Sequence, residues 1–491
     1  MRHVSAGLVL PLVLLVPARA EERKPGDPLP LVVSAAAAPT PSLKYHLLTA
    51  DRDQTDGNAA TLYYRAWATL AENKAFFNDL REPHWYEWLD TPLADLPLQE
   101  MEGKLALGRN MFHEIELAAR CRRCDWQLEG RPEGFALLLP EIQGFRSVGS
   151  MIAARARFHI ARGEWEEALR SFRAGFGLAR DLGRGPTFIH VLVGMAVGNV
   201  MCKQLEEFVQ RPEAPNLYWA LALLPRPFGD MRVALREERF MLERMFPLLK
   251  HLEDGPMSNA QVQAEMLRLR ARLDDFGLRR PSRAQQLAQA ALISNAAPES
   301  KRALVAQGFN EKLLDAMPAV QVVALKAYRQ YRDAYDEALK WTYVPGGFRH
   351  PGFREAAKKV EAAGRWLDQL FFHGLLRALD SIGVAFDKIR GSIDRLDRRL
   401  AALRCVEAMR LYAAARGRLP AALADVTEVP APSDPVSSKP FEYKVSGNFA
   451  TLTAPLPAGP KPPPGQLLSY EISLRPPEKP SKPEAPARKS P

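Results

Sequence analysis

The sequence predicts a mainly α-helical protein, arranged as an array of helical hairpins or as a bundle, with a long heptad helix and a small C-terminal β-meander. Three observations predict this fold class. Helical periodicity continues from about residue 43 to residue 341, with Pro and Gly breaks at intervals of one or two helix lengths. A heptad repeat follows between residues 375 and 403. Beyond Arg416, short alternating segments are typical of strands.

The first twenty residues have the pattern of a secretory signal peptide. A positively charged start precedes an apolar run from Ala6 to Val16, and Ala18-Arg19-Ala20 has the A-x-A form of a cleavage site. We therefore expect residues 1–20 to be removed and the mature protein to be exported, into the periplasm or the extracellular space. Residues 21–42 are rich in Pro and Ala, which indicates a linker.

The composition excludes some classes of partner. The chain has 491 residues, of which 47% are hydrophobic and 25% are charged, as is ordinary for a globular protein. The net charge of +10 comes from 67 basic residues interspersed with 57 acidic ones, so we expect no nucleic-acid partner. The longest apolar stretch after the leader, Phe188 to Cys202, is shorter than the roughly 20 residues that span a bilayer. We expect a buried helix there, and no transmembrane segment after signal cleavage.

Residues 43–345 are predicted to form a repeat-like helical domain. Its sharpest unit joins two helical patterns, 152–162 and 165–182, through Gly163-Glu164, with small residues and Phe172 where the helices would touch. This unit resembles the tetratricopeptide repeat, which implies stacked helix pairs with a concave binding surface. The alternative is a helical bundle that contains one accidental match.

Residues 346–415 are predicted to form a long coiled-coil-like helical segment. The apolar positions, spaced alternately by four and three residues, are Leu375, Leu379, Ile382, Phe386, Ile389, Ile393, Leu396, Leu400 and Leu403. Glycines at 383 and 391 each cost a helix about 1 kcal/mol relative to alanine, so this helix needs a packing partner. The candidates are the striped helix from Met317 to Trp341, or a second copy of the chain in a homodimer.

Residues 416–475 are predicted to form a small β segment, with strands at 441–445, 449–454 and 467–474. The motifs that bracket it are Leu411-Tyr412, Gly417-Arg418-Leu419-Pro420, Asp434-Pro435, Lys439-Pro440-Phe441 and Tyr443. They resemble the head region of pilin-like and pseudopilin proteins, which implies a long helix running through a Gly-x-x-Pro turn into a sheet. The whole layout also resembles a group of exported bacterial helical proteins, which implies no particular chemistry. Residues 476–491 are rich in Pro, Lys and Glu and have no apolar face, so we expect a disordered tail.

Four cysteines allow three pairings, and the sequence does not choose among them. Cys121 and Cys124 have the C-x-x-C spacing. They are interpreted as unpaired thiols, as a local structural disulfide or, less readily, as a redox pair, because no βαβ pattern surrounds them. Cys202 and Cys405 lie on apolar helix faces and are expected in the core.

No motif for catalysis, a cofactor or a metal is found, since nucleophile elbows, P-loops and dinucleotide fingerprints are all missing from the sequence. Aromatic residues between Tyr63 and Trp88 alternate with Glu82, Glu87 and Asp90, a composition that glycan-binding proteins and glycosidases also use. The leading hypothesis is an exported, non-enzymatic scaffold for an envelope protein or peptide. The alternatives are a subunit or accessory of a secretion or pilus-like assembly, and a glycan-binding or glycan-acting protein.

Overall fold

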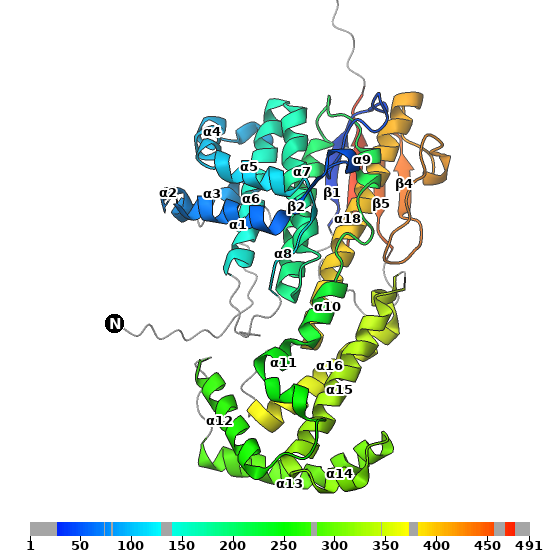
Figure 1. Cartoon of the computed structure of the whole chain (residues 1–491). Helices are drawn as coiled ribbons and strands as arrows, with labels where there is room; N and C mark the ends of the chain where they lie inside the picture. The colour runs from blue at the N-terminus through cyan, green and yellow to red at the C-terminus, as the bar shows by residue number, and fades with distance from the viewer. Residues whose placement is uncertain are drawn as a thin grey trace, which may run out of the picture.

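The computed structural model describes residues 27–72, 74–79, 82–128, 140–275, 282–344, 346–372, 382–455 and 467–476. The expected signal peptide and nearly all of the expected tail lie outside these ranges. The described chain is mainly helical with a small mixed sheet, which confirms the predicted fold class at this level. Figure 1 shows a body that holds α1–α9, the four-stranded sheet and α18, and an arm that holds α11–α16.

The body begins with short helices and continues into three long ones. The bounds are α1 (Ala59–Glu72), α2 (Lys74–Asp79), α3 (His84–Asp90), α4 (Leu98–Leu107), α5 (Arg109–Ala118), α6 (Pro140–Arg162), α7 (Trp165–Leu182), α8 (Phe188–Phe208) and α9 (Tyr218–Ala222). Helices α6, α7 and α8 pack against one another. The turn between α6 and α7 lies at Gly163, whose φ of 71° favours glycine. The predicted helix pair is therefore present, with its first helix beginning earlier than expected.

The arm is a set of helices reached through α10 (Arg232–Arg239). Its bounds are α11 (Met241–Met245), α12 (Asn259–Asp275), α13 (Arg283–Ala306), α14 (Glu311–Asp315), α15 (Ala319–Trp341) and α16 (Pro351–Leu367). Helices α15 and α16 form an antiparallel hairpin, and α13 packs on α15. The expected coiled-coil-like segment at 346–415 is not one rod, because α16 and α18 (Ile382–Arg416) are separate helices that pack against each other. A π-helical turn at Asp368–Phe372 follows α16.

The C-terminal sheet contains the expected meander and one strand from the other end of the chain. Strands β4 (Glu442–Ser446), β5 (Phe449–Thr453) and β6 (Ser469–Leu474) pair antiparallel. Strand β1 (Leu29–Val33) pairs parallel with β6, with Leu31 opposite Ile472, which gives the order β1-β6-β5-β4. The linker prediction for 21–42 is therefore wrong at β1. Leu31 and Val33 are buried, and this alternation supplies the apolar face that a strand needs.

Polar contacts attach the sheet and its loops to α8 and α18. The Tyr470 hydroxyl on β6 donates to Glu206 Oε1 on α8 at 2.6 Å, and Arg399 Nε on α18 donates to the same oxygen at 2.6 Å. Arg398 donates to both carboxylate oxygens of Asp434, at 2.9 and 3.0 Å. Burial alone would raise the pKa of Asp434. Hydrogen bonds to its carboxylate, chiefly those from Arg398, instead hold this pKa below its usual range. The loop before β4 is thus held against the helix.

A buried carboxyl group lies where the body meets the arm. Glu238 on α10 accepts a hydrogen bond from the backbone N–H of Phe188, at 3.0 Å, at the start of α8. Tyr331 and Tyr335 of α15 are buried electrostatic neighbours of this carboxyl group. Burial raises the pKa of Glu238 to about 7, and the Phe188 N–H and Arg244 only partly oppose this effect.

We expect the stability of the protein to fall between about pH 4.5 and pH 7 because of Glu238. The folded protein binds this proton more tightly than the unfolded chain, so the contribution is complete below pH 4.5 and is lost as the pH rises to about 7. Over this pH range the contribution of Glu238 to the free energy of unfolding falls by about 3 kcal/mol. Urea unfolding of wild type and Glu238→Gln across this range measures it, since the glutamine keeps an acceptor for Phe188. The exposed Glu213→Gln serves as the control, and a constant wild-type advantage over Glu238→Gln would contradict the expectation.

Candidate functional site

The structure does not join Cys121 and Cys124, so the disulfide interpretation is wrong for this conformation. Both thiols are free. Cys121 begins the short strand β3 (Cys121–Arg123), which pairs with β2 (Thr55–Asn58). Three steps of extended chain span about 10 Å and place side chains i and i+3 on opposite faces, whereas a disulfide needs Cα atoms within about 7 Å.

A shallow hollow of about 400 Å³ opens beside β2 and β3. Its lining residues are Thr55, Asp56, Gly57, Asn58, Thr61, Leu62, Leu117, Arg120 and Cys121. The side chain of Asn58 is already hydrogen-bonded within the protein. It donates to the carbonyl of Asp125 at 2.8 Å and accepts from the N–H of Asp125 at 2.7 Å. In the described ranges, no three His, Cys, Asp or Glu residues gather as a metal site. The Cys121 thiol contacts Thr55 Oγ1 at 3.9 Å and donates to the Leu117 carbonyl at 3.7 Å.

The second thiol lies beside a buried polar cluster of Tyr63, Trp126, Arg180 and Asp181. Tyr63 donates its hydroxyl to Asp181 Oδ2 at 2.9 Å, and Arg180 Nε donates to Oδ1 at 2.7 Å. The Tyr63 ring stacks on Trp126 with centroids 5.7 Å apart. Burial, and then the charge of Asp181, raise the pKa of the Cys124 thiol far above its usual range. Because the thiolate is the reactive form, a raised pKa disfavours nucleophilic chemistry at Cys124.

The aromatic region that suggested a glycan site is part of the core. Trp85 and Trp88 of α3 are buried, with ring centroids 5.0 Å apart. Tyr63 is also buried, and Trp67 packs edge-on against Phe145 at 6.0 Å. Aromatic platforms bind sugars only where their faces are open. The two tryptophans are therefore unavailable as a sugar platform in this structure.

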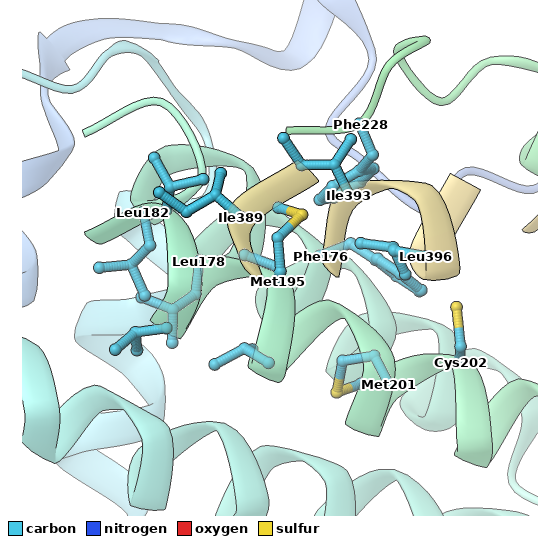
Figure 2. Close-up of a cluster of buried hydrophobic side chains, with 14 of the residues drawn as sticks. Phe176, Leu178, Leu182, Met195, Met201, Cys202, Phe228, Ile389, Ile393 and Leu396 are labelled. Atoms are coloured by element: carbon cyan, nitrogen blue, oxygen red, sulfur yellow. The ribbon is translucent and has the colours of Figure 1, made fainter. Parts of the chain in front are cut away.

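The heptad helix packs inside the protein. Phe386, Ile389, Ile393, Leu396, Leu400 and Leu403 are all buried, whereas Leu375, Leu379 and the side chain of Ile382 lie outside the described part. Figure 2 shows Ile389, Ile393 and Leu396 gathered with Met195 of α8 and Phe176 of α7. A Cβ atom on Gly198 of α8 would lie 2.6 Å from Leu396, so the two helices are in close contact.

The packing partner of this helix differs from the expected one. Helix α18 lies mainly against α8, and the expected partner α15 pairs with α16 instead. Helix α15 touches the seam at one end, where Tyr335 and Phe386 meet edge-on at 5.9 Å. The chain's own helices already cover the described seam residues. These residues therefore cannot form the interface of a homodimer.

The arm leaves large apolar side chains uncovered. Leu267 on α12 is 57% exposed and Leu287 on α13 is 71% exposed. Thirteen large apolar side chains are exposed in the described ranges, and six belong to the arm: these two and Val305, Leu313, Tyr343 and Val344. Single exposed leucines are normal on a surface. Because nearly half of the exposed large apolar side chains belong to the arm, we take the arm as the candidate region for contact with a partner, with Leu267 and Leu287 as its most exposed leucines. This apolar arm surface is our candidate functional site.

Local structure fixes the orientation of Leu287. Ser282 caps α13, since its Oγ accepts from the Gln285 N–H at 3.3 Å while the Gln285 side chain accepts from the Ser282 N–H at 2.8 Å. Leu292, Ile293, Ala296 and Ala297 then face the core. Leu287 precedes Ala296 by about two and a half turns and so lies on the opposite side of the helix. Sequence reasoning missed it because an isolated leucine in a helix is usually a core residue.

No protein-family model, curated protein or solved structure matches the chain.

Helix α8 is the one described helix that is long and apolar enough to cross a membrane by length and composition. Within the protein, 67% of its most apolar window is buried, chiefly by α6, α7 and α18. We therefore keep the interpretation of α8 as a core helix. The protein thus consists of a packed body and a projecting helical arm that carries exposed apolar side chains.

Proposed function

We propose that this protein is an exported, non-enzymatic helical scaffold that holds another protein or peptide of the cell envelope on its arm. The observation that carries the proposal is the exposure of Leu267 and Leu287 on helices that project from the body. Apolar side chains that a chain leaves uncovered gain free energy when a partner covers them, by about 25 cal/mol for each Å² buried.

The packing of the body supports this choice among the three hypotheses. The two tryptophans that a sugar platform would need are buried, as are the described residues of the heptad seam. Helices α6, α7 and α8 pack as successive antiparallel neighbours, the arrangement from which a tetratricopeptide-like array is built. We propose that these helices form the rigid base from which the arm presents its surface.

Site-specific photocrosslinking tests the proposal. A photoreactive phenylalanine analogue is placed at Leu267 or Leu287 in the full chain, in cells that produce it. We expect a discrete protein adduct from both positions. Leu107 on α4 is the matched control, because it is 56% exposed but belongs to the body. Adducts no stronger at the arm than at Leu107 would contradict the proposal.

A role in a secretion or pilus-like assembly is a second candidate, favoured by the region after α18. Helix α18 ends at Gly417, whose φ of 71° turns the chain, and the Tyr443 hydroxyl donates to the Pro420 carbonyl at 2.9 Å. The helix thus leads through this turn and the loop of residues 417–441 into strand β4, the order of elements that the resemblance to pilin heads implies. Adducts to a component of a secretion machine from probes on β4 or β5, with none from the arm, would favour this candidate.

A further inference from the structure

The short helix α9 exposes a tryptophan and a leucine beside α18. Tyr218 anchors α9, since its hydroxyl donates to the Pro430 carbonyl at 2.6 Å. The next residue, Trp219, is 37% exposed, and its ring meets Tyr218 edge-on at 5.2 Å. Leu223, four residues further on, is 51% exposed. Positions i and i+4 are neighbours on a helix surface, so the two side chains form one apolar strip.

Two arginines adjoin this strip without a carboxylate partner. The Arg404 guanidinium lies 5.7 Å from the Tyr218 ring centroid, and its buried Nε has no hydrogen-bond partner in the described chain. Arg226 Nη2 donates to the Ala222 carbonyl at 2.6 Å. No carboxylate of the described residues lies within salt-bridge distance of either side chain. We call Trp219, Leu223, Arg226 and Arg404 the basic-aromatic patch.

Several other arginines of α18 have a carboxylate partner among the described residues, which Arg404 lacks. Arg398 pairs with Asp434, Arg399 with Glu206 and Arg410 with Glu407. Burial, and then the charge of Arg226, lower the pKa of Arg404 from its usual value. Each cause makes a positive charge less favourable at this position, and an added carboxylate would offset both.

We propose that the basic-aromatic patch binds an acidic segment of a partner protein, with a carboxylate between Arg226 and Arg404 and an apolar side chain on Trp219 and Leu223. Guanidinium and carboxylate groups form charge-assisted hydrogen bonds, and Trp and Arg dominate the binding energy of many interfaces. The inference rests on the proposed scaffold function and adds a second surface, on the body, with a stated partner chemistry.

An acidic segment suits the patch better than an anionic membrane does. Adsorption to anionic lipids draws on clusters of about four to eight basic residues. The patch has two arginines, and Arg404 is half-buried beside Tyr218. Such a site matches one carboxylate and one neighbouring side chain.

The test begins with a display library of random twelve-residue peptides, selected on the mature full-length protein. We expect enriched peptides to combine Asp or Glu with Trp, Phe or Leu. A selected peptide, labelled for fluorescence anisotropy, should bind at least tenfold more weakly to Arg226→Gln/Arg404→Gln and to Trp219→Ala. Exposed Arg122→Gln on β3 is the matched control and should bind normally. Affinity should also fall as salt is raised.

Three results would overturn the inference. The selected peptides could lack acidic residues, or the double variant could bind the selected peptide as tightly as the wild type does. The third result is that the protein binds phosphatidylglycerol vesicles through these residues and binds no peptide. Circular dichroism of each variant verifies folding. Arg226→Glu/Arg404→Glu should also gain affinity for a lysine-substituted copy of the selected peptide, which a misfolded variant would not do. Arm crosslinks that persist in the double variant would leave the scaffold function standing whatever the outcome at the patch.

Discussion

Arg410→Ala is expected to lower the free energy of unfolding by about 3–5 kcal/mol. Arg410 lies in the interior of α18, where Nη1 donates to both oxygens of Glu407 at 2.9 and 3.0 Å. The same guanidinium donates to the carbonyls of Ser34 and Ala214, at 2.9 and 2.7 Å. Burial already raises the pKa of Glu407 against the opposing charge of Arg410. The alanine variant would bury this carboxylate without a cation and leave two carbonyls without their donor.

Urea unfolding at neutral pH measures the effect, with Arg416→Ala as the control on the same helix. Arg416 is half-exposed and lies 3.9 Å from Glu428, so its removal should cost at most about 1 kcal/mol. The double variant Glu407→Gln/Arg410→Met removes both charges and should recover part of the lost stability. If Arg410→Ala lowered the free energy of unfolding no more than Arg416→Ala does, the buried Arg410 would not be what holds α18 to the segment at Ser34.

Gly194→Ala is expected to destabilise the protein by about 1–3 kcal/mol, because α7 and α8 approach too closely for a methyl group. A Cβ atom at Gly194 would lie 2.4 Å from the Gly183 nitrogen and 2.7 Å from the Ala179 carbonyl oxygen. Both are backbone atoms at the end of α7, so relief requires the helices to separate. Thermal unfolding followed by circular dichroism measures the loss.

Gly391→Ala is the matched comparison on α18. A Cβ atom there meets only the far end of Arg395, at 4.0 Å. Alanine at this helical position should therefore stabilise the protein, by about 0.5–1 kcal/mol. If the two variants changed stability in the same direction, close backbone approach would not be the reason for glycine at position 194.

The heptad helix illustrates how far sequence reasoning reaches. The spacing identifies the buried face correctly, because Ile389, Ile393 and Leu396 must leave water together. It does not identify the partner, since any apolar helix can cover such a face. Contact with α8 depends on Gly198 admitting Leu396, a match of shapes between segments far apart in the chain. The same limit applies to the seam as a dimer surface.

Strand β1 was missed for a related reason. Its five residues, between prolines and an alanine run, have the local composition of a spacer. What makes them a strand is hydrogen bonding to β6 and burial of Leu31 and Val33, and neither has a local signal. The sequence analysis missed the candidate surfaces because the exposure of Leu267, Leu287 and Trp219 depends on tertiary packing. Helical periodicity does not show which other segments cover a side chain.

The pairing of β1 with β6 also constrains how the protein is made. Strand β1 is synthesised well before its neighbour β6, so this part of the sheet cannot close until β6 has been made. Until then Leu31 and Val33 lack the neighbouring strand beside which they are buried in the folded protein. A product that terminates before β6 would therefore leave the edge of β1 without its partner strand and open to pairing with another chain.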